Sequence, residues 1–108
     1  MIDREARLME EIVSRIRRAS QPIQIVLFGS SVRGDAGPDS DLDILVVVPN
    51  GTHRRRTARD IFLALSGIGR PKDIVVVTEE DIKNYGSNPS FVIAPALKEG
   101  RELYHAAG

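Results

Sequence analysis

The stretch that most limits the possible folds of this chain is the run LDILVVV at residues 42–48. After Asp43 this run holds only aliphatic residues. A strand with one face in water alternates apolar and polar side chains, whereas a strand covered on both faces is apolar throughout. We therefore expect residues 42–48 to form a central strand of a sheet that carries helices on both faces.

Two other aliphatic runs predict further strands, at residues 23–28 and 73–77. The residues RELYH, at 101–105, predict a short edge strand. Between these runs, apolar residues recur at helical spacing. Because helices and strands alternate, we expect an α/β fold with a small mixed β-sheet of about three to four strands packed with helices.

The first two helices are predicted from their caps and their apolar faces. One should begin after an N-cap at Asp3 and end before Pro22. The next has Thr52 as its expected cap. Its buried face should consist of Ala58, Ile61, Phe62 and Leu65.

Two shorter helices are expected in the last third of the chain. Thr78 and Asp81 have the spacing of a capping box, which predicts a helix directly after the strand at 73–77. The last helix should begin at residues 88–89 and end at Gly100. Pro95 lies inside that span and predicts a kink or an early break.

Composition restricts the classes of function. The 108 residues, of which 42% are hydrophobic, suit one packed domain, residues 1–108. Lysine plus arginine and aspartate plus glutamate number 15 each, which argues against a protein that mainly coats nucleic acid. Without cysteine, disulfides, thiolate metal sites and cysteine nucleophiles are excluded. No apolar run approaches the roughly 20 residues of a membrane span, so we expect a cytoplasmic protein without a membrane partner.

Three aspartates stand at the starts of predicted strands. Asp41 and Asp43 are two residues apart, and residues two apart on a strand share a face. Asp73 begins DIVVV much as Asp43 begins DILVVV, with Lys72 beside it as a possible neutralising charge. If the two strands are neighbours, three carboxylates gather at one sheet edge. Such oxygen ligands suit Mg²⁺, and two ions could serve an in-line displacement at phosphorus.

Other patterns fit the same stretch less well. DSDLDI has acids at the first, third and fifth positions of an EF-hand loop, but Ile44 stands where that loop needs glycine. Gly29 and Gly34 have the spacing of a P-loop, but Asp35 stands where that loop needs lysine. We expect Asp35 and Asp39 to be solvated turn acids.

One pattern of several parts fits throughout. It consists of Gly29-Ser30, then Arg33-Gly34, then Ser40-Asp41-Leu42-Asp43 before an apolar strand. This order resembles the signature of the DNA polymerase β-like nucleotidyltransferase superfamily, and Asp73 matches that family's third carboxylate. The resemblance covers about residues 23–77. The short length and the EGRELY ending are similar to the minimal nucleotidyltransferases of the MntA-like antitoxin group.

The resemblance implies a polymerase-β-like nucleotidyltransferase fold and a nucleotide-binding turn. Gly29 would let the backbone approach a phosphate, and Ser30 would help to hold the triphosphate. Arg33 would add a charged contact to a phosphate, or would pair with a nearby acid instead. The implied substrate is a nucleoside triphosphate, ATP.

The resemblance also assigns the acids. Asp41, Asp43 and Asp73 would be both the catalytic and the metal-binding residues, and they would hold two Mg²⁺ ions. Asp73 could also accept the proton of the attacking hydroxyl. The implied reaction transfers a nucleoside monophosphate, AMP from ATP, to a hydroxyl group and expels pyrophosphate.

The acceptor implied by the resemblance is a protein. Relatives with small-molecule or RNA substrates carry a second helical domain, and this chain leaves no residues for one. The MntA-like group suggests a HEPN-type toxin as the partner, with AMP placed on one of its tyrosines. The chain would then be the antitoxin of a HEPN/MNT toxin–antitoxin pair.

Two alternatives remain open. The chain could be a non-catalytic antitoxin that blocks its partner sterically, or an RNA-terminal nucleotidyltransferase. The basic run HRRR at residues 53–56 would serve the second alternative by contacting RNA. A solvated helix face is the plainer interpretation of this run, and nucleic acid is not the favoured partner.

Overall fold

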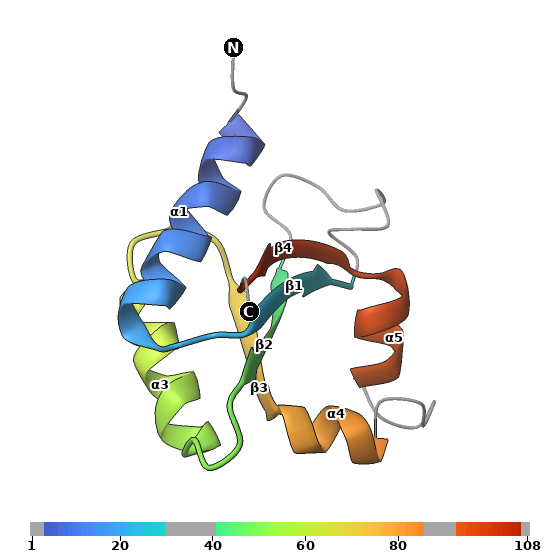
Figure 1. The fold of residues 1–108 in the computed structure, drawn as a ribbon. Helices are drawn as coiled ribbons and strands as arrows, with labels where there is room; N and C mark the ends of the chain where they lie inside the picture. The colour runs from blue at the N-terminus through green and yellow to red at the C-terminus, as the bar shows by residue number, and fades with distance from the viewer. Residues whose placement is uncertain (1–3, 30–40, 86–92, 107–108) are drawn as a thin grey trace.

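A computed structural model describes residues 4–29, 41–85 and 93–106. They form a single layered α/β unit in which helices cover both faces of one sheet (Figure 1). None of the helices in these ranges is both long and apolar enough to cross a bilayer. The expected N-cap Asp3 and the expected helix start at residues 88–89 lie outside the described residues.

The sheet has four strands in the spatial order β3-β2-β1-β4. They are β1 (Gln24–Phe28), β2 (Leu42–Val48), β3 (Lys72–Thr78) and β4 (Arg101–His105). Strands β2 and β3 run parallel, whereas β1 is antiparallel to both β2 and β4. The expectations of a small mixed sheet, a central strand at 42–48 and an edge strand at 101–105 are therefore confirmed.

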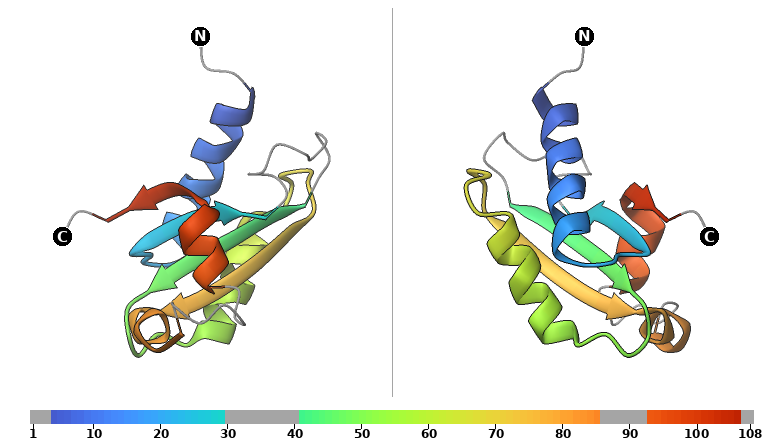
Figure 2. Two further views of the ribbon diagram at one scale, coloured as in Figure 1. Left: turned by 90° about the vertical axis from the view of Figure 1, so that its right-hand side faces the viewer. Right: turned by 60° about the vertical axis from the view of Figure 1, so that its left-hand side comes forward.

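The helices lie on opposite faces of this sheet. Helices α1 (Arg4–Ala19) and α3 (Arg54–Ala64) cover one face, and α4 (Glu79–Tyr85) and α5 (Ile93–Glu99) lie on the other (Figures 1 and 2). The parallel connection from β2 to β3 passes through α3, as a parallel pair requires a crossover. The α4–α5 segment then returns the chain to β4 at the opposite edge.

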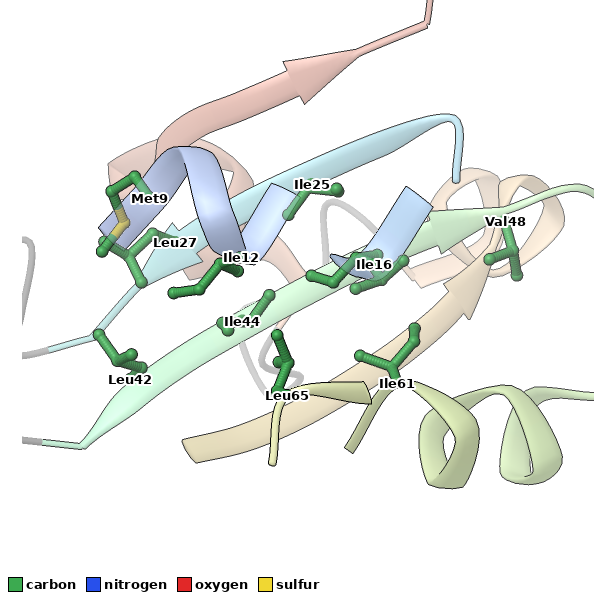
Figure 3. Close-up of a cluster of buried hydrophobic side chains, with 11 residues drawn as sticks. Met9, Ile12, Ile16, Ile25, Leu27, Leu42, Ile44, Val48, Ile61 and Leu65 are labelled. Carbon is green, nitrogen blue, oxygen red and sulfur yellow. The ribbon is translucent and has the colours of Figure 1, made fainter. Parts of the chain in front are cut away.

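Alternate residues of β2 enter two separate hydrophobic clusters. Leu42, Ile44, Val46 and Val48 pack against α1 and α3, in the cluster of Figure 3. Leu45 and Val47 pack on the other side with residues of α5. All of these side chains are buried, which is why the strand can be apolar throughout.

Two details of α3 differ from the sequence expectation. The N-cap is His53 rather than Thr52, because the His53 imidazole Nδ1 accepts a hydrogen bond from the backbone N–H of Arg56 at 3.1 Å. Phe62 was expected in the core but is 50% exposed. Its ring lies beneath Lys72 on the outer strand β3, with Nζ 4.9 Å from the ring centre.

Pro95 does not kink the last helix. Within the described residues α5 begins at Ile93, so Pro95 is in the first helical turn. The backbone N–H groups of that turn have no partner within the helix, and proline therefore removes no hydrogen bond there. The described helix runs without interruption from Ile93 to Glu99, so the expected kink or early break at Pro95 was wrong.

The capping box at the start of α4 is confirmed and predicts a pH dependence of stability. Thr78 N–H donates to Asp81 Oδ2 at 2.9 Å, and Asp81 N–H donates to Thr78 Oγ1 at 3.1 Å. The pKa of Asp81 lies below its ordinary value of 3.8. The main cause is the hydrogen bond from the Thr78 backbone N–H, and the contact with Arg54 lowers the pKa further. A lowered folded-state pKa stabilises the fold above pH 3.8, and that stabilisation is lost as the pH falls through the folded-state pKa.

We therefore expect Asp81→Asn to cost about 1 kcal/mol at neutral pH, the usual size of a capping contribution. The variant should also lose stability less steeply than the wild type on acidification below pH 4. Urea unfolding between pH 2.5 and 7 measures both effects. Parallel stability curves for the two proteins across this range would contradict the assignment.

Gly100 joins α5 to β4 where no side chain fits. A Cβ atom at this position would collide with the Ala96 carbonyl oxygen and with Val26 Cγ1, and would lie 3.0 Å from the Leu27 carbonyl oxygen. Gly100→Ala is therefore expected to lower the free energy of unfolding by about 2–3 kcal/mol, a typical overpacking cost. Urea unfolding measures this loss. A Gly100→Ala variant as stable as the wild type would contradict the packing explanation.

Candidate active site

The register of the sheet brings two of the predicted acids together. In the parallel β2–β3 pair, Asp43 lies directly opposite Asp73. Neighbouring strands are about 4.8 Å apart, and paired residues of a parallel sheet point to the same face. Two carboxylates separated by thirty positions in the sequence therefore become neighbours. The sequence analysis expected this juxtaposition if the two strands were adjacent.

The pair belongs to the face of the sheet that carries α4 and α5. Leu45 and Val77, two and four residues further along the strands, are core residues of that face. On β1, Phe28 is the register partner of Asp43, so Phe28, Asp43 and Asp73 form a row across three strands. Phe28 packs against the cluster on this face. Phe28 was not among the predicted site residues. Its position directly before Gly29 in the sequence could have indicated that it lies next to the site.

Asp41 lies immediately before β2 and is exposed. Strand pairing starts one residue later, where Leu42 N–H donates to the Pro71 carbonyl oxygen at 2.9 Å. This hydrogen bond fixes the start of β2 against the segment that leads into β3. Asp41 is therefore held within one strand repeat of Asp43, at the same end of the sheet.

Lys72 does not face the carboxylate of Asp73. Lys72 precedes Asp73, but successive side chains of a strand point to opposite faces, and Lys72 lies over the Phe62 ring on the α3 side. The sequence-based suggestion that Lys72 neutralises Asp73 is therefore not what the structure shows. Within the described residues, no ion pair involves Asp41 or Asp73.

Gly29 lies against the carboxylate of Asp43. Its φ of +82° is in the left-handed region, which favours glycine. A Cβ atom at this position would overlap Asp43 Oδ2. Glycine is thus required at residue 29 for two reasons, the backbone conformation and the space taken by the Asp43 carboxylate.

The remaining predicted site residues lie outside the described part of the chain. These are Ser30 and Arg33, together with the two acids expected in the turn, Asp35 and Asp39. The described residues thus place Gly29 and the three aspartates at one end of the sheet. The assignment of Ser30 and Arg33 to a nucleotide phosphate stays a prediction.

The acids do not form a complete metal cage by themselves. Across residues 4–29, 41–85 and 93–106, no group of three or more histidine, aspartate or glutamate side chains is arranged to hold a metal ion. Mg²⁺ in phosphate-handling sites usually takes only one or two carboxylates from the protein, and substrate phosphates and water complete its shell. The Asp43–Asp73 pair with Asp41 beside it fits a donor set of that kind.

Comparison with known families agrees with this arrangement. Residues 9–102 match the nucleotidyltransferase domain family. The chain belongs to this family. The match includes all four strands except the last residues of β4, and all three aspartates. The resemblance inferred from the glycine-serine turn and the acids is therefore confirmed, and so is the expected nucleotidyltransferase fold.

A relative in sequence comes from Methanocaldococcus jannaschii. That protein is named for an inferred protein adenylyltransferase activity, and it is 38% identical to this nucleotidyltransferase domain over 81 residues. The matched region is 75% of this chain but 44% of the relative. The chain thus spans less than half the length of that protein.

Solved structures share the fold. A toxin–antitoxin structure described as an MntA–HpeT mutant, in which two aspartates two positions apart are replaced by glutamate, superimposes with a TM-score of 0.67. The match covers 91% of this chain and 73% of that chain, at 18% identity. A toxin–antitoxin structure with AMP-PNP gives a TM-score of 0.62 at 20% identity and the same coverages.

A third structure, from Sulfolobus solfataricus, is described as an inferred nucleotidyltransferase. It superimposes with a TM-score of 0.61 at 20% identity, over 92% of this chain and 78% of that chain. All three structures are 20% identical to this chain or less, so they support the fold alone.

Proposed function

We propose that this nucleotidyltransferase domain transfers AMP from ATP to a hydroxyl group of a protein partner in a Mg²⁺-dependent reaction. The observation that carries the proposal is the register that places Asp43 beside Asp73 at the open start of β2 and β3. Like charges held this close repel each other, so such a pair is disfavoured unless a cation shares the site. A protein that only blocked its partner sterically would have no need of this arrangement.

Asp41, Asp43 and Asp73 would hold the Mg²⁺ ions, two in number, together with phosphate oxygens of the nucleotide. When bound, the metal neutralises charge on the phosphates and on the departing pyrophosphate. The carboxylates would hold the metal charge in a fixed position, because the backbone of β2 and β3 fixes the carboxylates. Gly29 contributes by leaving room for the Asp43 carboxylate at the turn that follows β1.

The reaction is a displacement at the α-phosphorus of ATP. The acceptor hydroxyl oxygen forms a bond to that phosphorus, while the bond from phosphorus to the oxygen that bridges to the β-phosphate breaks. AMP is then esterified to the acceptor, and pyrophosphate leaves with the electron pair of the broken bond. The carboxylate of Asp73 takes the proton of the hydroxyl. Ser30 and Arg33 would hold the departing phosphates.

A protein acceptor is supported by the names of two kinds of similar protein. The Methanocaldococcus relative is named for protein adenylyltransferase activity, and two fold neighbours are toxin–antitoxin structures. We propose accordingly that this chain is the antitoxin of a HEPN/MNT pair and modifies a tyrosine of a HEPN-type toxin. One of the two neighbours holds the ATP analogue AMP-PNP, which supports ATP as the substrate.

Neutralisation of the partner distinguishes catalysis from steric blocking. The proposed toxin, expected as the product of the gene adjacent to that of this chain, is expressed in bacterial cells with the wild-type chain or with the double variant Asp41→Asn plus Asp43→Asn. We expect growth to be restored by the wild type and not by the double variant, although both bind the partner in a pull-down. Full rescue by the double variant would show that binding alone neutralises.

A further inference from the structure

Strand β3 leaves one edge of the sheet open. Within the described residues only β2 pairs with it, and β3 is the outermost strand of the order β3-β2-β1-β4. Exposed edge strands are commonly protected by charged side chains, proline or bulges. Here the only charges are Lys72 and Asp73 at the start, and the following residues IVVVT carry none. The outward backbone N–H and C=O groups of this stretch can pair with another strand.

A groove with a volume of about 660 Å³ follows this open edge. Its floor on the α3 side of the sheet is made by the half-buried side chains of Ile74 and Val76 of β3. Val75, whose side chain packs on the other face, also lines the groove. Its wall is the start of α3, including Arg55 and Ala58. Figure 2 shows α3 alongside β3 for most of the length of the strand. The groove therefore combines an aliphatic floor, an open hydrogen-bonding edge and a basic wall.

The two arginines in the wall of the groove, Arg54 and Arg55, differ in their ion pairing. Arg54 is held by Asp81, with Nη1 2.7 Å from Oδ2, and so belongs to the cap of α4. Arg55 is exposed and takes part in no ion pair within the described part of the chain. None of the described residues that line the groove is acidic. An occupant that follows β3 would therefore gain from an acidic side chain opposite Arg55.

We propose that β3 accepts an extended segment of a protein partner, with acidic and aliphatic residues in alternation, as a fifth strand of the sheet. Main-chain hydrogen bonds would supply affinity, the aliphatic floor would receive alternate side chains, and Arg55 would select for acid. A second copy of this chain is a poorer occupant, because the only acid of its own β3 is Asp73. RNA is also poorer, because the floor has no aromatic ring on which bases could stack.

The surface is continuous with the candidate active site, because Asp73 directly precedes Ile74 on the same strand. A partner segment paired along β3 would bring the residues at one of its ends toward the acids. In this respect the inference deepens the proposed function by naming how the acceptor protein docks. The docking test uses neither ATP nor Mg²⁺, so its failure is separate from failure of catalysis.

The probe is a fluorescently labelled eight-residue peptide of alternating glutamate and valine, with alternating lysine and valine as its control. Anisotropy titrations compare the wild type with Arg55→Glu and with Arg56→Glu, an exposed neighbour outside the groove. We expect Arg55→Glu to weaken binding of the acidic peptide at least fivefold and Arg56→Glu to change it less than twofold. A glutamate in the first turn of α3 suits the helix dipole, so the fold should tolerate both changes.

Amide hydrogen exchange locates the bound peptide. The acidic peptide should slow exchange at those amides of residues 74–76 that are not hydrogen-bonded to β2, and leave the opposite edge strand, β4, unchanged. Equal effects of the two variants, equal binding of the lysine peptide, or protection at β4 would each overturn the proposal. Two further results would overturn it. One is self-association of the chain that Arg55→Glu abolishes; the other is Arg55-dependent binding of an RNA oligonucleotide together with no binding of the acidic peptide.

Discussion

Replacing Asp43 by asparagine should lower the rate of nucleotidyl transfer by about 10³-fold or more, equivalent to about 4 kcal/mol of transition-state stabilisation. The change keeps the shape of the side chain and removes one charge of the Asp43–Asp73 pair. Like charges on directly opposed strand residues repel each other, so this part of the change does not destabilise the fold. We therefore expect a large loss of activity with a free energy of unfolding within about 1 kcal/mol of the wild type.

Steady-state kinetics and urea unfolding of the same preparations measure the two quantities. Asp60→Asn is a matched control, because Asp60 is a carboxylate of α3 outside the candidate site. This control should retain activity within about twofold. If Asp43→Asn lost activity only in proportion to a loss of stability, Asp43 would be a structural residue rather than a catalytic one.

Replacing Gly29 by alanine is the second change with a large expected effect. The new Cβ would overlap Asp43 Oδ2 and would impose a left-handed backbone conformation on an alanine. The backbone cost is about 1–2 kcal/mol of stability. Because the carboxylate must also move, we expect activity to fall by about 10²-fold, since small misplacements of catalytic groups have effects of this size.

Gly51→Ala separates these two effects. Gly51 has a similar φ of +90°, but no atom lies within 4 Å of the position that its Cβ would take. This control should lose comparable stability from the backbone and should keep its activity. A Gly29→Ala variant with normal activity would show that the close approach of residue 29 to Asp43 has no part in the reaction.

The fold was predictable where its determinants are local. The aliphatic run after Asp43 identified a strand covered on both faces, and the spacing of Thr78 and Asp81 identified a capping box. Phe62 was misassigned because helical periodicity shows which residues share a face but not where the sheet ends. The sheet ends at β3, so Phe62 lies half-exposed beside the outermost strand, with Lys72 over its ring.

The acidic residues of the candidate site could be predicted from the sequence. Their arrangement could be predicted only on the assumption that the two strands are neighbours. The spacing of Asp41 and Asp43 is a local property of one strand. The place of Asp73 beside Asp43 depends on which strands are neighbours and in what register, which follows from the β2–α3–β3 crossover. The contact between Gly29 and Asp43 depends on β1 pairing with β2, and no local pattern encodes it.

The most direct test of the central claim follows the two ends of the triphosphate separately. The chain is incubated with Mg²⁺, the product of the adjacent gene and ATP labelled at either the α- or the γ-phosphorus. We predict that the α-label becomes attached to the partner with release of an equal amount of pyrophosphate, and that Asp43→Asn abolishes this transfer. Attachment of the γ-label, or α-label transfer that persists in Asp43→Asn, would contradict the account.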